Sequence, residues 1–119
     1  METNTTTLYR PIGQKEYELI QATNSRRFPP RLPSQPIFYP VLREDYAIQI
    51  ARDWNTKDPV SGFVGYVVRF RVENSFLVNY EVHKVGAQQK HLEYWIPADE
   101  LEKFNDHIVG AIEVVHVFR

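Results

Sequence analysis

Phe63-Val64-Gly65-Tyr66-Val67-Val68-Arg69-Phe70-Arg71-Val72 is the stretch that defines the fold best. Large apolar side chains stand at every second position from Tyr66 to Val72, and two arginines stand between them. A period of two predicts a β-strand with one face in the core. Residues 76–85 alternate in the same way, so we expect a second strand there, joined to the first by the tight turn Glu73-Asn74-Ser75.

Strands and helices are also expected on both sides of this pair. Leu8-Tyr9-Arg10 reads as a first strand that stops at Pro11, because proline removes a ladder donor. The other predictions are strands at 36–41, 90–96 and 111–118, helices at 13–20, 43–54 and 99–108, a proline- and arginine-rich loop at 21–36, and a link at 86–89. This order predicts one α+β domain over 8–119, with two to three short helices on a mixed or antiparallel sheet, behind a disordered tail over 1–7.

Composition excludes several classes of protein. The 14 basic and 15 acidic residues give a formal charge of −1, so the total does not point to a polyanion or a membrane surface. The absence of cysteine excludes disulfides and thiolate chemistry. No apolar stretch approaches the roughly 20 residues of a membrane span, and the start of the chain lacks the pattern of a signal peptide. We therefore expect a cytoplasmic protein without a membrane partner.

One carboxylate breaks the pattern of its strand. In His91-Leu92-Glu93-Tyr94-Trp95-Ile96-Pro97, Glu93 lies among aromatic and aliphatic residues where β-propensity favours other side chains. Alternation places it on the same face as His91 and Trp95. A catalytic acid on a rigid strand would explain the exception, and a carboxylate on the solvent face of an antiparallel sheet is the simpler alternative.

Three further residues could work with such an acid. The guanidinium of Arg10 can hold a phosphate or a ribose hydroxyl, the rings of Tyr39 and Tyr46 can sandwich a flat ring, and the carboxylate of Glu93 can stabilise a developing cation. These are the parts needed to break a glycosidic bond to nicotinamide. The alternatives are that Arg10 pairs with a surface carboxylate and that the tyrosines are core aromatics.

A resemblance to a known family runs from Leu8 to Phe118. The order of elements is similar to that of a small ADP-ribosyltransferase-like domain. The motifs that resemble short bacterial proteins of the ADP-ribosylation/crystallin J-type family are Leu8-Tyr9-Arg10-Pro11, Phe28-Pro29-Pro30-Arg31-Leu32-Pro33, Pro36-Ile37-Phe38-Tyr39-Pro40-Val41, Ala51-Arg52-Asp53-Trp54-Asn55 and Phe104-Asn105-Asp106-His107-Ile108-Val109-Gly110.

This resemblance implies an enzyme that cleaves the nicotinamide–ribose bond of NAD, as an ADP-ribosyltransferase or an NAD glycohydrolase. It implies that Glu93, Arg10 and Tyr39 are catalytic, and that NAD, as substrate, is bound by Arg10, Tyr39, Tyr46 and Arg31. His91 stands where arginine-modifying transferases often carry a second acid. The acceptor stays open among another protein side chain, a nucleic acid, a small molecule and water.

Two other functions are compatible with the same residues. The domain could be a catalytically inactive nucleotide- or protein-binding module on the same fold. It could also be an interaction protein in which the helix around 46–54 contributes to a dimer face, so both a monomer and a homodimer remain open.

The loop and the histidines complete the candidates. Arg26, Arg27 and Arg31 could grip phosphates bidentately or could be solvated side chains, and Phe28 is expected to anchor the loop in the core rather than to stack on a base. A metal site on His83, His91 and Glu93 is geometrically conceivable, but the histidines lack a ligand spacing, so no metal is predicted.

Overall fold

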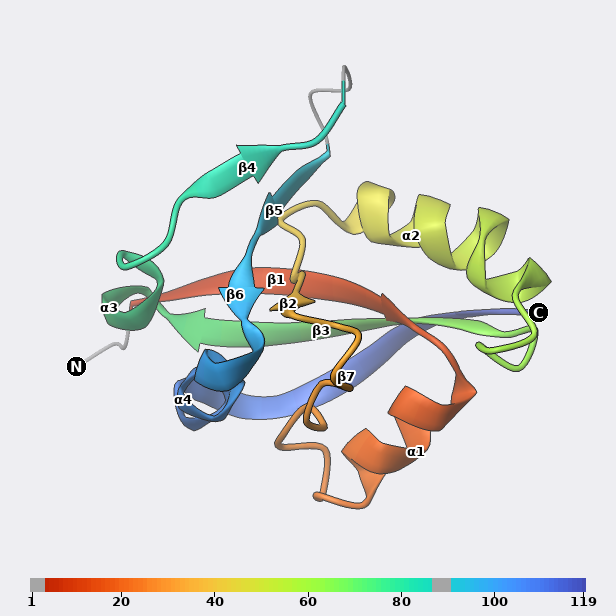
Figure 1. Ribbon diagram of the computed structural model, residues 1–119, viewed down its shortest axis with the longest axis horizontal. Coiled ribbons are helices and arrows are strands. Elements are labelled where there is room, and N and C mark those ends of the chain that lie inside the picture. Colours follow the sequence, from red (N-terminus) through yellow and green to blue (C-terminus); the bar gives the residue numbers. More distant parts are fainter. Residues whose placement is uncertain (1–3, 87–90) are drawn as a thin grey trace.

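The computed structural model describes residues 4–86 and 91–119 of the chain (Figure 1). Its helices and strands follow one another as β1 (Thr5–Ile12), α1 (Gln14–Gln21), β2 (Ile37–Phe38), α2 (Glu44–Asp53), the 3-10 turn η1 (Asn55–Lys57), β3 (Gly65–Glu73), α3 (Asn74–Leu77), β4 (Val82–Lys84), β5 (Leu92–Tyr94), β6 (Ile96–Pro97), the 3-10 turn η2 (Ala98–Glu100), α4 (Leu101–Asp106) and β7 (Ile108–Phe118).

An antiparallel sheet with β3 at its centre organises the fold. β3 pairs with β1 on one side and with β7 on the other. Val41 forms bridges to Tyr9 of β1 and to Glu93 of β5, so the β4–β5 pair continues the sheet beyond β1. A separate two-stranded pair joins β2 and β6. All these pairings are antiparallel, which confirms the predicted α+β class for the part of the chain that the structure describes.

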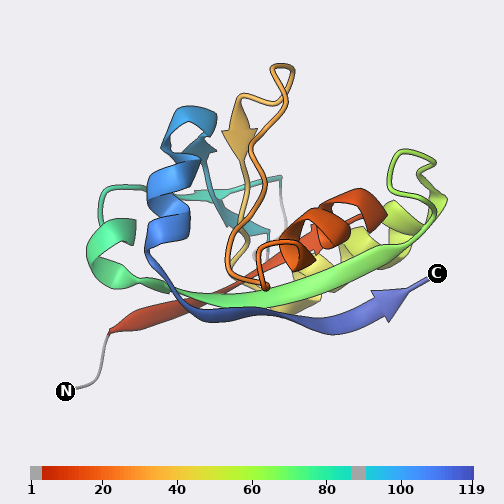
Figure 2. The ribbon, with the colours of Figure 1, turned by 90° about the horizontal axis from the view of Figure 1, so that it is seen from below.

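Each face of the sheet carries its own core. Figure 2 shows α1, α4 and the segment between α1 and β2 on one side of the three long strands. On that side the predicted alternating residues of β3 are buried with Phe28, Phe38 and Phe104, whose rings pack 4.9 to 6.5 Å apart. On the other face Val67 packs against α2. Burial of such aromatic side chains is the main stabilising contribution, at roughly 25 cal/mol per Å² of apolar surface.

Gly65 lets α2 approach β3 closely. A Cβ atom at this position would lie 2.7 Å from the carbonyl carbon and 2.8 Å from the Cα of Ala51. These distances are shorter than a carbon–carbon contact allows. The absence of a side chain at Gly65 is therefore what permits α2 to lie against the sheet.

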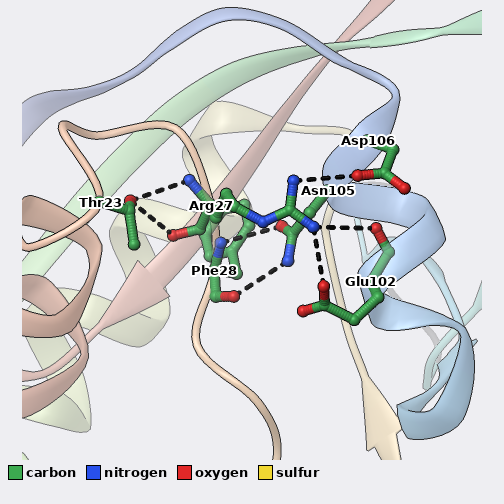
Figure 3. A network of polar contacts seen from close by, with 6 residues as sticks. All are labelled: Thr23, Arg27, Phe28, Glu102, Asn105 and Asp106. Atoms are coloured by element: carbon green, nitrogen blue, oxygen red, sulfur yellow. Dashed lines mark hydrogen bonds and ion pairs between the residues drawn. The ribbon is translucent and has the colours of Figure 1, made fainter.

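The loop at 21–36 is held against α4 by a polar network (Figure 3). The amide of Phe28 donates to Oδ1 of Asn105 at 2.9 Å, and Nδ2 of Asn105 donates to the Phe28 carbonyl at 3.0 Å. Arg27 makes ion pairs with Glu102 and Asp106 at 2.9 and 3.0 Å. Phe28 is 2% exposed, so its predicted role as the anchor of the loop is confirmed.

Residues 76–85 do not form the predicted strand. The chain makes the helical turn α3 and then the short strand β4, so the described residues contain one helix more than expected. Phe76 and Leu77 are both buried. Neighbouring residues of a strand point to opposite faces, whereas a helical turn can bring both side chains into the same core.

The first strand is longer than the sequence predicts at both ends. β1 begins at Thr5, within the segment assigned to a tail, of which residues 1–3 lie outside the described part. It also continues through Pro11. The amide of Tyr9 bonds to Val41, away from β3, and the nitrogen of Pro11 is two residues further on and faces the same way. Proline therefore removes no bond to β3 and does not end the strand.

Other boundaries differ by a few residues. The expected strand 90–96 is divided into β5 and β6 by Trp95, the expected helix 99–108 is η2 followed by α4, and β7 begins at Ile108. The predicted link at 86–89 and the start of the expected strand at residue 90 fall largely on 87–90, which lie outside the described residues. In the described part of the chain, no helix is long and apolar enough to cross a bilayer.

Candidate functional site

One cavity of about 390 Å³ is lined by Arg10, Tyr39, Tyr46 and Glu93. The same cavity is lined by Pro11, Val41, Ile50, Val85 and Trp95. The bridges of Val41 to β1 and to β5 explain the convergence, because they place the end of the first strand beside the strand that carries Glu93. The three predicted catalytic residues, Arg10, Tyr39 and Glu93, therefore line the same cavity.

Glu93 is held by two donors and lies largely out of solvent. Its side chain and backbone together are 8% exposed. Oε1 accepts a hydrogen bond from the indole nitrogen of Trp95 at 2.8 Å, and Oε2 accepts one from the hydroxyl of Tyr46 at 3.2 Å. The alternative that Glu93 is a solvated surface carboxylate is wrong.

No ion pair joins Glu93 to a basic side chain in residues 4–86 and 91–119. Two neutral donors orient the carboxylate without neutralising it. An oriented and largely buried negative charge acts strongly on a positive charge that develops nearby.

Tyr46 positions Glu93, and the Tyr46 ring stacks on His91. The residue is 8% exposed, and the centroids of the Tyr46 and His91 rings lie 4.2 Å apart. Burial, followed by the negative charge of Glu93 and the hydrogen bond to it, raises the pKa of Tyr46 to about 12. The hydroxyl therefore remains protonated at neutral pH and donates to the carboxylate.

Tyr39 and Trp95 are the accessible aromatic groups of the cavity. They are 40% and 43% exposed and meet edge to face, with centroids 6.4 Å apart. One face of the Trp95 ring is covered by His83, which stacks on it with centroids 3.8 Å apart. Trp95 was missing from the predicted site, although its place on the same strand face as Glu93 was the signal that could have identified it.

Arg10 is paired within the protein. Its Nε and Nη2 donate to the carboxylate of Glu16 at 2.7 and 3.1 Å, and Nη1 donates to the Tyr39 carbonyl at 3.4 Å. Its guanidinium carbon lies 4.6 Å from the centroid of the Phe38 ring. Arg10 thus pairs with a carboxylate of the protein, which was the alternative to a substrate-binding role. In this arrangement the residue supports the wall of the cavity.

The arginines of the loop have separate environments. The guanidinium of Arg27 forms ion pairs with two carboxylates of α4, so it does not serve as the phosphate-binding group considered from the sequence. Arg26 is exposed. Arg31 does not line the cavity of Glu93 but lines a neighbouring one, on the other side of Arg10. Among the described residues, no three histidine, aspartate or glutamate side chains are grouped so that they could hold a metal ion.

Comparisons with protein-family models, with curated proteins and with solved structures found no match to this chain. The class that the structure defines is an antiparallel α+β domain.

Proposed function

We propose that the protein cleaves the bond between nicotinamide and ribose in NAD and transfers the ADP-ribosyl group to an acceptor or to water. The observation that carries the proposal is the convergence of Glu93, Arg10 and Tyr39 on one cavity. Residues that act on one substrate must share a pocket, whereas unrelated surface residues need not.

The carboxylate of Glu93 supplies the electrostatic part of this reaction. When the bond breaks, its electron pair moves to the ring nitrogen of nicotinamide, which becomes neutral, and positive charge develops on C1′ and the ring oxygen of ribose. A carboxylate held by Tyr46 and Trp95 stabilises that charge without having to reorient. An acceptor oxygen or nitrogen then forms the new bond to C1′ and loses its proton.

Tyr39 and Trp95 supply a surface for the leaving ring. The nicotinamide ring of NAD is flat and positively charged, and aromatic faces attract such a ring by stacking and by cation–π interaction. Both side chains are partly exposed at the cavity, so they are accessible to a ligand. In this proposal the nicotinamide ring binds to Tyr39 and Trp95, whereas the sequence pointed to Tyr39 and Tyr46.

A binding module without chemistry is the second candidate. The observation that favours it is the bidentate ion pair between Arg10 and Glu16, which occupies donors that a transferase would direct to its substrate. In this case the cavity would bind NAD or ADP-ribose without turnover.

Nicotinamide release from NAD, followed by chromatography, tests the first proposal. Glu93→Gln is expected to lower the rate at least 100-fold, in the range seen when one oriented electrostatic group is removed. Glu81→Gln is the matched control, since Glu81 is exposed and does not line the cavity. Its rate should equal that of the parent.

Two outcomes would contradict the proposed cleavage of NAD. One is the absence of nicotinamide release by the parent protein, and the other is an equal rate for the parent and Glu93→Gln. Because an amide offers only one acceptor to the two donors, Glu93→Asp serves as a second variant that keeps the charge, and circular dichroism verifies folding. Calorimetric binding of NAD without any release would support the binding module.

A further inference from the structure

A second cavity of about 420 Å³ lies beside the first and shares Arg10 and Pro11 with it. It is enclosed by α1, the 29–35 part of the loop and the 54–61 segment after α2. Its basic lining residues are Arg10, Lys15 and Arg31, and its apolar lining includes Leu19, Leu32, Trp54 and Val60. The proposed cleavage of NAD uses none of these residues except Arg10.

Arg31 has an unused donor in this cavity. Its Nε is buried and has no hydrogen-bond partner among the described residues. A buried charged donor without a partner costs free energy, and such groups are normally satisfied in folded proteins. Arg31 also lines the cavity and forms no ion pair with the described residues, so its guanidinium can pair with an anion that enters there.

A second guanidinium, that of Arg10, lies near Arg31 and favours the binding of an anion. The guanidinium carbons of Arg31 and Arg10 lie 5.9 and 4.6 Å from the centroid of the same ring, that of Phe38. Burial, and then repulsion from Arg10, lower the pKa of Arg31. Two like charges held close together are relieved when an anion binds between or beside them.

The acids of the cavity leave Arg31 available. Glu16 is bound bidentately to Arg10. Asp58 accepts hydrogen bonds from the Val60 amide at 3.2 Å and from the Ser61 hydroxyl at 2.8 Å. Neither carboxylate forms an ion pair with Arg31, so the charge that faces the cavity is positive.

The rest of the lining suits a flat apolar group. Trp54 is 61% exposed and Val60 is 88% exposed, which leaves large apolar surfaces in water beside the arginines. An exposed tryptophan next to a guanidinium can stack a ring while the guanidinium holds a phosphate bidentately.

We infer that this second cavity binds a phosphorylated compound with a flat ring, its phosphate on Arg31 and its ring on Trp54. The site does not depend on the cleavage of NAD. Its ligand could be a free mononucleotide or the phosphorylated half of a dinucleotide, because both present the same chemistry.

The two tryptophans of the chain allow each cavity to be observed separately. Trp54 lines the second cavity and Trp95 lines the first. In Trp95→Phe, fluorescence reports only on Trp54, and adenosine monophosphate is expected to change it saturably. Adenosine, which lacks the phosphate, should bind at least 10-fold more weakly, since a charge-assisted hydrogen bond is lost.

Arg31→Gln in the same Trp95→Phe background should weaken binding of adenosine monophosphate at least 10-fold. Arg31→Lys keeps a charge but lacks the bidentate fork, so its affinity should be intermediate. Arg26→Gln is the matched control, because Arg26 belongs to the same loop, is exposed and does not line the cavity. Its affinity should equal that of the Trp95→Phe protein.

Several results would overturn the inference: no response of Trp54 to adenosine monophosphate, equal binding of adenosine, or equal losses in Arg31→Gln and Arg26→Gln. Competition by NAD, measured with Glu93→Gln added to the background, identifies the source of the ligand. Displacement supports a site for half of a dinucleotide, and simultaneous binding supports a site for a free nucleotide. Failure of nicotinamide release leaves this test unaffected, since it contains no turnover step.

Discussion

Asn105 is the residue whose replacement gives the clearest test of how the loop at 21–36 is held. Asn105 is 4% exposed, and its side-chain amide both donates a hydrogen bond to the backbone of Phe28 and accepts one from it (Figure 3). In Asn105→Ala the amide and the carbonyl of Phe28 lose their partners while the ring of Phe28 stays in the core. The variant therefore isolates the polar contribution from the hydrophobic one.

The expected loss follows from these two bonds. Each buried backbone group without a partner costs about 1–3 kcal/mol, and alanine recovers about 0.5 kcal/mol because it is a better helix former than asparagine within α4. Partial solvation of the freed groups reduces the summed cost. We therefore expect the free energy of unfolding to fall by about 3 kcal/mol, from a total of roughly 5–15 kcal/mol. The melting temperature should fall by about 12 °C.

Asn79→Ala is a matched control. Nδ2 of Asn79 also donates to a phenylalanine carbonyl, that of Phe76, at 2.9 Å, but Asn79 is exposed. Water can replace this bond, so the loss should stay near 0.5 kcal/mol. Urea unfolding followed by circular dichroism measures both variants, with an unchanged m-value as the sign of an unchanged unfolded state.

A loss of unfolding free energy below about 1 kcal/mol for Asn105→Ala, or one equal to that of Asn79→Ala, would show that Asn105 does not hold the loop, because each buried unsatisfied group alone should cost at least that much. The same variant should also weaken binding of adenosine monophosphate in the second cavity. The loop that Asn105 fixes carries Arg31, so its release raises the cost of ordering the site.

Two further changes test the support of the first cavity. Gly65→Ala should destabilise the protein by about 1–3 kcal/mol, measured by urea unfolding, because the new Cβ collides with the backbone of Ala51 in α2; unchanged stability would show that α2 can move away freely. Tyr46 has its pKa raised from 10.0 to about 12, so the folded protein keeps a proton that the unfolded chain loses, and stability should fall as the pH rises from 10 towards 12. Tyr46→Phe should show a shallower fall over this window in unfolding experiments at stepped pH, and an equally steep fall would mean that Tyr46 does not cause it.

Periodicity was sufficient for the elements that obey one simple rule. α1 and α2 were predicted within two residues of their ends, and the alternating residues of β3 are buried as predicted. Each has one face in the core, which leaves a regular mark in the sequence. The sequence did not predict α3, because its two adjacent buried residues, Phe76 and Leu77, fit neither the period of a strand nor that of a longer helix.

The candidate site was predicted in part. Glu93 was identified because it breaks the rule of its strand, and the structure brings Arg10 and Tyr39 to the same cavity. The pairing of Arg10 with Glu16 and the stacking of Tyr46 on His91 could not be predicted. Both depend on side-chain directions in three dimensions, which spacing along the chain does not fix.

Periodicity and composition along the chain were enough to indicate the class of the domain, most of its helices and strands, and the carboxylate around which the first cavity is built. Which groups surround that carboxylate, and that Arg31 lines the second cavity without an ion pair to the described residues, follow from the tertiary packing alone. Local patterns record whether a residue is buried, because burial selects side chains along one face. They do not record its partners: Val41 joins β1 to β5, and Glu16 pairs with Arg10, only after long-range packing has brought these segments together.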